Sequence, residues 1–277
     1  MEFRCKTFSL NHSHSTMKVG TDAVLLASVV AEFFANFKTE NPIIPNTNSN
    51  LDARNSEIAR HNNEMVGENR IDENGSVENI LDIGTGCGIL SLCMAQIFEN
   101  AKITAIDIDE KSVNEATDNF YNSPFAQRMS ANTISVQDFA YNTEEKFDLI
   151  ISNPPFFTSS LQSPDLRRNN ARHNAVLSTE DFVLSCTKLL SVNGFVAVVL
   201  PEKEMVAMIT LFNSKDINPV LITNVFAKPE SPLKRKICIF SVSNKENIVP
   251  ITKTLYIRTA NNEYSKHYRQ LTSHFLL

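Results

Sequence analysis

Residues 79–96, "NILDIGTGCGILSLCMAQ", constrain the fold more than any other stretch of the chain. A short apolar run typical of a buried strand leads directly into a glycine-rich turn, and the turn leads directly into a helical pattern. Three of the seven glycines in the protein, Gly84, Gly86 and Gly88, lie in this turn. Glycine permits positive φ and lets a ligand approach the backbone, and the N-terminus of the next helix faces that ligand. The stretch therefore predicts an α/β fold with a ligand site at the turn.

Apolar, β-rich runs alternate with helical patterns from Asn79 onward, which is typical of strand–helix–strand units on a parallel sheet. Runs such as "LIIS" and "FVAVVL" are apolar on both faces, which indicates strands covered by helices on both sides. Two later runs flank "KPESPLKRK" and predict an antiparallel hairpin. Strands are expected near 80–83, 102–106, 132–136, 147–151, 195–200, 220–226 and 236–242, and helices near 22–36, 88–99, 110–122, 178–191 and 202–213.

Composition divides the chain into three parts. Residues 1–37 form an N-terminal segment with its own helix, which Thr21 or Asp22 can cap. Residues 38–79 contain ten asparagines and no sustained periodicity, so we interpret them as a polar insertion that buries too little apolar area to offset its ordering entropy. Residues 80–277 form the main domain.

Charge is unevenly distributed along the chain, whose formal net charge is −5. Residues 38–79 hold four basic and eight acidic side chains, whereas residues 228–277 hold nine lysines and arginines against three glutamates. The basic C-terminal part suits a polyanionic partner, although a solvated charged face gives the same pattern.

Cysteine spacing and hydropathy exclude several classes of protein. The five cysteines form no CxxC pair and do not cluster with histidine, so neither a metal site nor a disulfide framework is expected and the thiols are interpreted as structural. No window approaches the roughly 20 apolar residues of a membrane-spanning helix. The run "AVLLASVVAEFFANF" is broken by Glu32 and lacks a basic region directly before it. We therefore expect a cytoplasmic protein without membrane contact.

Carboxylates at successive strand ends indicate the class of ligand. The turn reads D-x-G-x-G-x-G, with Asp82 at the strand end and Ile89 where a dinucleotide fingerprint has its third glycine. Asp107 ends the next strand, where a carboxylate accepts both ribose hydroxyls. Asp138 ends the third, where it would meet the amine of an adenine or cap a loop. Three carboxylates suit the cationic S-adenosylmethionine better than the two phosphates of NAD, although NAD sites also use a ribose carboxylate.

The fourth strand runs into "NPPF", residues 153–156, at the same carboxyl edge of the sheet. The prolines cannot donate hydrogen bonds and hold an extended geometry, so the turn offers mainly acceptors. The side-chain carbonyl of Asn153 and the main-chain carbonyl of Pro154 can each accept one proton of a planar amine and aim its lone pair at a methyl donor. Phe156 would stack on a base that has left its base stack. A strand terminator with core phenylalanines is the alternative interpretation of an isolated NPPF.

NPPF placed after D-x-G-x-G and Asp107 resembles the amino-methyltransferase class of S-adenosylmethionine-dependent enzymes, over residues 80–242 at least. The resemblance implies a Rossmann-like class I methyltransferase fold, an α/β architecture with a seven-stranded, mostly parallel sheet, an antiparallel last strand and helices on both faces. Families in this class methylate adenine in DNA or tRNA, the 2-amino group of guanine in rRNA, or a glutamine of release factors.

The N-terminal stretch "FSLNHSHSTMKVGTDAVLLAS" is similar to the opening of the bacterial family that methylates the 6-amino group of the adenosine beside the anticodon of a valine tRNA. The resemblance implies tRNA as partner and an N-terminal segment that covers the methionine part of the cofactor. Lys18, Thr21 and Asp22 are therefore candidate cofactor contacts, with a helix cap as the alternative role of Asp22. The rRNA and release-factor activities remain the alternative functions.

Two basic stretches also fit that family: "RRNNARHN", shortly after NPPF, and "PLKRK", before the last predicted strand. Such side chains would contact phosphates, which gives salt-dependent affinity without base specificity. Exposed charge without a partner is the competing interpretation. The predicted phosphate contacts are Arg167, Arg168, Arg172, Lys234, Arg235 and Lys236.

Overall fold

The computed structural model describes residues 2–13, 20–40, 77–154, 177–242 and 249–276. A mixed sheet of eight strands forms the centre of the molecule, in the order β10-β8-β9-β7-β6-β3-β4-β5. Its strands are β3 (Asn79–Ile83), β4 (Lys102–Asp107), β5 (Met129–Thr133), β6 (Phe147–Ser152), β7 (Leu190–Leu200), β8 (Ile217–Phe226), β9 (Leu233–Val242) and β10 (Ile251–Tyr256). A separate pair, β1 (Glu2–Arg4) and β2 (Ser9–Asn11), is antiparallel.

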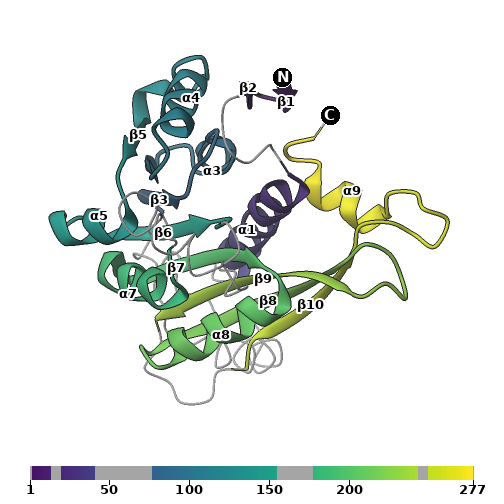
Figure 1. Cartoon of the computed structure of the whole chain (residues 1–277). Coiled ribbons are helices and arrows are strands. Elements are labelled where there is room, and N and C mark those ends of the chain that lie inside the picture. Colours follow the sequence, from purple (N-terminus) through teal and green to yellow (C-terminus); the bar gives the residue numbers. More distant parts are fainter. Residues whose placement is uncertain (1, 14–19, 41–76, 155–176, 243–248, 277) are drawn as a thin grey trace, which may run out of the picture.

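Helices cover both faces of the sheet, as expected (Figure 1). One face packs against α1 (Thr21–Glu40), α3 (Ile89–Ile97), α4 (Glu110–Tyr121) and α9 (Lys266–Thr272). The other packs against α5 (Val136–Asn142), α7 (Thr179–Leu189) and α8 (Glu202–Asn213). Phe34 of α1 illustrates the first core, since its ring lies 5.3 Å from the ring of Phe195 on β7 and 5.2 Å from that of Phe98. The central strands are apolar on both faces because both faces are covered.

The predicted α/β class is confirmed, but the expectation of seven strands ending in an antiparallel one is wrong in detail. β9 is antiparallel to both neighbours, β7 and β8, while the other neighbouring strands pair in parallel. β10 follows β9 in the chain and pairs in parallel with β8, as an eighth strand at the sheet edge. Its sequence gives a weak signal because an edge strand is largely solvated: within β10, Leu255 is the buried residue.

The third predicted strand, near 132–136, is shifted in the structure. β5 spans Met129–Thr133, and a helix, α5, begins at Val136. Ser135 caps that helix: its hydroxyl accepts a hydrogen bond from the amide of Asp138 at 3.0 Å and donates one to the Asp138 carboxylate at 2.6 Å. This reciprocal cap outweighs the β-branched run "TISV", and β5 itself is polar because it lies at the sheet edge.

Asp82, near the end of β3, is a fully buried carboxylate inside the sheet. Its Oδ2 accepts hydrogen bonds from the Thr85 hydroxyl at 2.7 Å, the Ser91 amide at 3.1 Å and the Ser91 hydroxyl at 2.7 Å. Among the described residues, its Oδ1 has no hydrogen-bond partner. Burial raises the pKa of Asp82 to about 6, despite the opposing effect of these donors. The carboxylate therefore ties the glycine turn and helix α3 to the sheet.

The raised pKa of Asp82 predicts a specific pH dependence of stability. The pKa of this carboxyl is about 6 in the folded protein and near 3.8 in the unfolded chain, so the folded state binds the proton more tightly. The group therefore stabilises the fold at low pH, and this contribution is lost as pH rises from about 4 to about 6. A shift of this size corresponds to a contribution of order 3 kcal/mol to the free energy of unfolding. The free energy of unfolding of Asp82→Asn, measured in urea, is therefore expected to lack this decrease between about pH 4 and pH 6. If the free energies of unfolding of the variant and the unmodified protein changed with pH in parallel, the prediction would be contradicted.

Candidate functional site

The carboxyl ends of β3 and β6 bring the glycine turn close to Asn153 and Pro154, the first two residues of the NPPF stretch. The two strands are neighbours in parallel register, with Asp82 opposite Ile151. Beyond the last register pair, the Ser152 hydroxyl donates a 2.7 Å hydrogen bond to the carbonyl of Ile83. Asn153, the next residue after β6, therefore lies beside the start of the glycine turn. The sequence prediction that the glycine turn and the residues after the fourth strand share one edge of the sheet is confirmed for Asn153 and Pro154.

The three glycines of the turn differ in what surrounds them. All have positive φ: 73° at Gly84, 55° at Gly86 and 85° at Gly88. A Cβ built on Gly88 would lie 2.5 Å from Cε1 of Phe120, so this glycine serves the packing of α3 against α4. A Cβ built on Gly84 or Gly86 meets no described atom within 4 Å. The open backbone of these two glycines can accommodate a ligand at close range.

Asp107, the last residue of β4, holds the turn from its other side. Its Oδ2 accepts a hydrogen bond from the Gly86 amide at 2.9 Å, and its Oδ1 accepts one from the Asp109 amide at 3.0 Å. The amides of Gly84 and Thr85 bond in addition to the carbonyl of Ile106. Each carboxylate oxygen of Asp107 retains a further acceptor site, so both remain able to receive hydroxyl donors.

Asn153 and Pro154 directly follow β6 at this edge of the sheet. Asn153 is partly exposed, whereas Pro154 is buried. The predicted site residues Phe156, Lys18, Arg167, Arg168 and Arg172 lie outside the described residues. Their roles stay predictions.

The N-terminal segment is fastened to the glycine turn through α4. Asn119 exchanges two hydrogen bonds with the backbone of Asn11 at 2.8 Å each, and its amide group also donates to the carbonyl of Cys87 at 2.8 Å. Glu115 accepts a 2.6 Å hydrogen bond from the amide of Ser13. Both side chains are buried, yet the sequence prediction did not include them. The sequence does contain a sign of their burial: they are polar residues that lie beside the apolar stripe of α4, which Val113, Ala116 and Phe120 define.

Several other predicted site residues are engaged within the protein. Asp22, in the first turn of α1, forms a 2.8 Å ion pair with Arg235 of β9. Lys236 donates to the side-chain oxygen of Asn224 at 2.9 Å and lies 3.4 Å from a carboxylate oxygen of Glu202.

Three more predicted positions are exposed: Thr21 at the start of α1, Lys234 on β9, and Asp138 in the first turn of α5. Asp138 follows the end of β5 by five residues, so the expectation that the third strand leads directly into it is wrong. Its carboxylate accepts the Ser135 hydroxyl and stays open to solvent.

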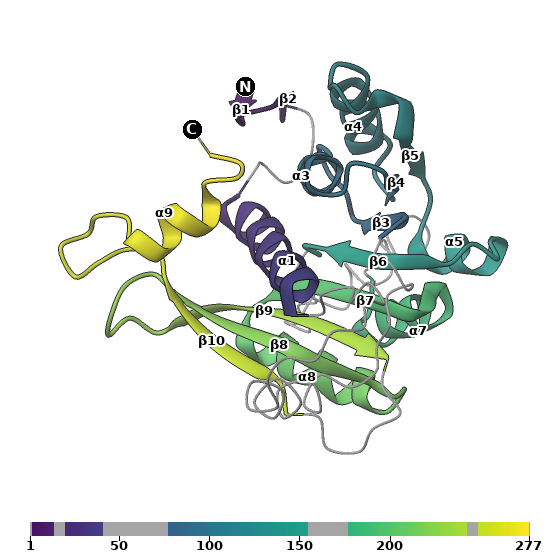
Figure 2. The same cartoon turned by 180° about the vertical axis from the view of Figure 1, so that it is seen from behind.

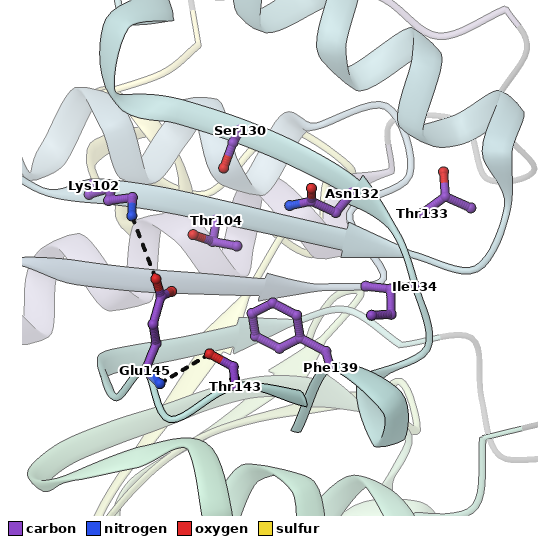
Figure 3. A pocket seen from close by; sticks show the side chains of 9 residues that line it. All are labelled: Lys102, Thr104, Ser130, Asn132, Thr133, Ile134, Phe139, Thr143 and Glu145. Atoms are coloured by element: carbon purple, nitrogen blue, oxygen red, sulfur yellow. Dashed lines mark hydrogen bonds and ion pairs between the residues drawn. The ribbon is translucent and has the colours of Figure 1, made fainter. Parts of the chain in front are cut away.

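A groove of about 490 Å³ lies next to this edge, over β4 and β5 (Figure 3). Hydroxyl and amide side chains line most of it, and the Lys102–Glu145 ion pair, 3.9 Å long, closes one end. Ile134 and Phe139 line the end nearest the carboxyl edge (Figure 3). None of the predicted site residues in the described part of the chain lines this groove. The candidate site therefore consists of the turn, Asp107 and Asn153.

Within the described ranges, no group of three or more histidine, cysteine, aspartate or glutamate side chains is arranged to hold a metal ion. In the same ranges no helix combines the length and apolar character needed to span a membrane. The five cysteines are free and buried, and burial raises the pKa of Cys87, inside the glycine turn, to about 11.

Comparison with known proteins agrees with this geometry. The family model described as methyltransferase small domain matches residues 69–206. A solved structure titled as a predicted O-methyltransferase, Atu636 from Agrobacterium tumefaciens, aligns with a TM-score of 0.58 over 92% of this chain and 96% of that one, at 16% identity, and shares the fold.

Relatives named tRNA1(Val) (adenine(37)-N6)-methyltransferase align over nearly their whole length. The protein of that name from Flavobacterium psychrophilum is 32% identical over 99% of both chains. Its counterpart from Bacteroides fragilis strain YCH46 is 32% identical over 99% of this chain and 97% of its own. With this identity along the entire sequence, and a glycine turn, strand-end aspartate and Asn-Pro segment at one edge of the sheet, the chain belongs to the tRNA1(Val) (adenine(37)-N6)-methyltransferase family.

Proposed function

We propose that this enzyme transfers a methyl group from S-adenosylmethionine to the 6-amino group of the adenosine beside the anticodon, position 37, of a valine tRNA. The observation that carries the proposal is the position of Asn153 and Pro154 directly beside the glycine turn, in a chain of this family. A substrate in the cytoplasm suits the expected cellular location.

The residues of the turn fit the cofactor. S-adenosylmethionine, when bound, supplies an electrophilic methyl group on a positively charged sulfur. The open backbone at Gly84 and Gly86 gives room for it, and the free acceptor sites of Asp107 suit the two hydroxyls of a ribose. Asp82 and Asp107 add negative charge near the turn, which favours a cation over a pyrophosphate.

Asn153 and Pro154 would activate the amine. The exocyclic amine of adenine is a poor nucleophile because its lone pair is delocalised into the ring. If the Asn153 side-chain carbonyl and the Pro154 main-chain carbonyl each accept one amine proton, the nitrogen can become pyramidal and direct its lone pair at the methyl group. The same oxygens stabilise the positive charge that develops on nitrogen. The proton is then released to water, so no dedicated base is required.

Other residues retain proposed supporting roles. Phe156 would stack on the flipped adenine, and Lys18, Thr21 and Asp22 would cover the methionine part of the cofactor. The hydrogen bonds that join Asn11 and Ser13 to Asn119 and Glu115 support this second role, because Asn119 also donates to the carbonyl of Cys87 in the turn. Arg167, Arg168, Arg172 and Lys234 would bind phosphates, whereas Arg235 and Lys236 would do so only alongside their contacts within the protein.

The substrate is tested by offering tritiated S-adenosylmethionine with bulk tRNA, ribosomal subunits or release factors. We expect label in tRNA, located by nuclease digestion in 6-methyladenosine next to the anticodon. Label in rRNA or protein, with none in tRNA, would overturn the substrate assignment and leave the amine chemistry in place.

Replacing Asn153 tests the amine chemistry. Asn153→Ala removes one acceptor that acts in the transition state, so kcat is expected to fall by about 100-fold or more, while the affinities for cofactor and tRNA change little. Single-turnover kinetics with binding titrations give both quantities. Asn132→Ala, the same change at an exposed asparagine of β5, serves as control and is expected to keep the normal kcat. A kcat of Asn153→Ala close to that of the control would refute the role.

Alanine at two glycines separates cofactor binding from packing. Gly86→Ala places a methyl group in the open space beside the turn and is expected to weaken S-adenosylmethionine binding, with a stability loss of roughly 1–2 kcal/mol from its positive φ. Gly88→Ala also forces the Phe120 ring to move and is expected to cost roughly 1–3 kcal/mol more. Calorimetric titration and urea unfolding measure the two effects. Unchanged cofactor affinity in Gly86→Ala would show that the ligand does not lie against this turn.

A further inference from the structure

A second polar surface lies at the far end of the same carboxyl edge. β10 runs parallel to β8, so both strands end there, and the chain continues from Tyr256 into a loop at 257–265. This loop is joined to the tip between β8 and β9: the amides of Ile257 and Arg258 donate to the carbonyls of Phe226 and Ala227 at 3.0 and 2.9 Å. The two loops project side by side in both views (Figures 1 and 2).

Three side chains form an ordered stack on this surface, which we call the Arg258 stack. Tyr268 of α9 is buried, and the Tyr264 ring lies on it at 4.9 Å between centroids and 12° between planes. The Arg258 guanidinium lies over the Tyr264 ring, 4.3 Å from its centroid. Arg258 also donates from Nη1 to the carbonyl of Asn262 at 2.7 Å, so the guanidinium is held in place before any ligand arrives.

The charge around the Arg258 stack is mainly positive. Beside Arg258, the tip and the C-terminal loop and helix carry four exposed basic side chains, against the two glutamates Glu230 and Glu263. Among the described residues, none of the four takes part in an ion pair. They are Lys228, Lys234, Lys266 and Arg269.

A stack of planar groups surrounded by cations is suited to bind one class of ligand, an unpaired nucleotide. A planar guanidinium on an aromatic ring offers a π-surface to a base, and lysines nearby neutralise its phosphates. A purely electrostatic surface would not need a buried tyrosine under an exposed one. A protein partner would be expected to cover apolar area, whereas the exposed side chains around the stack are mostly charged or polar.

We propose that the Arg258 stack binds an unpaired base of the RNA substrate, several nucleotides from the adenosine that reacts, while Lys228, Lys234 and Lys266 contact the adjoining phosphates. The stack lies four strands from β6 along the edge, or about 19 Å from Asn153 at the usual strand spacing. This span exceeds one nucleoside, so the surface anchors the RNA apart from the reacting base. The proposal rests on the function proposed above.

The test compares two replacements of Arg258. Arg258→Ala removes plane and charge, whereas Arg258→Lys keeps the charge and removes the plane. Both are expected to raise the Kd and the KM for tRNA by roughly 10-fold, with kcat at saturating tRNA and the affinity for S-adenosylmethionine unchanged. Lys215→Ala, an exposed cation at the opposite edge, just before β8, is the matched control and is expected to bind tRNA as the unmodified enzyme does.

Each outcome decides one question. If Arg258→Lys binds tRNA normally and Arg258→Ala does not, Arg258 contacts phosphate and the stacking role is overturned. If both bind normally in an enzyme that methylates tRNA, the surface is not part of the RNA site at all. If the unmodified enzyme does not methylate tRNA, the proposed function itself fails. Tyr264→Phe, which keeps the ring, should retain affinity, and thermal unfolding of each variant shows that α9 stays docked.

Discussion

The attachment of the glycine turn to two strand-end carboxylates is the constraint on which the site depends. Asp82 holds the turn and the start of α3 from within the sheet, and Asp107 holds the Gly86 amide from the next strand. Backbone with positive φ at three positions is costly to order, and these bonds fix it without using the open faces of Gly84 and Gly86. The turn is therefore held in one conformation by hydrogen bonds on its core side, while the backbone of Gly84 and Gly86 stays open toward a ligand.

The same carboxylates explain why a cation suits this place. Burial and the nearby Asp107 both raise the pKa of Asp82, which means that a second negative charge here is unfavourable in the absence of positive charge. A cationic ligand would lower the electrostatic energy of these carboxylates, whereas a pyrophosphate would raise it. In the proposed function, the carbonyls of Asn153 and Pro154 would act on the substrate in the same way, because the nitrogen that is methylated also becomes positively charged. One edge of the sheet thus favours positive charge at two successive points.

Sequence reasoning succeeded where a local pattern determines a local structure. The strand, glycine turn and helix around Gly86, the hairpin of β8 and β9, and the convergence of the turn with Asn153 all follow from residues close in sequence and from the geometry of parallel strands. It failed at the solvated edges of the sheet, where β5 and β10 have few buried side chains to produce a pattern. Asn119 was missed for another reason: its partners, Asn11 and Cys87, are distant in sequence, and its position beside the apolar stripe of α4 indicates burial but does not identify those partners.

The distribution of basic residues shows why charge alone is a poor guide to RNA contacts. "PLKRK" contains three cations in a row, yet two of them have partners within the protein. Arg235 pairs with Asp22, and Lys236 contacts Asn224 and Glu202. Lys234 remains exposed, and two more exposed cations share its end of the sheet. Lys228 lies there through the hairpin of β8 and β9, and Lys266, distant in sequence, lies there through the pairing of β10 with β8. A cation becomes available to a polyanion when the fold leaves it without an internal acid, which the sequence does not reveal. A chain with net charge −5 can therefore carry a locally positive surface, because most of its acidic residues lie in other parts of the chain.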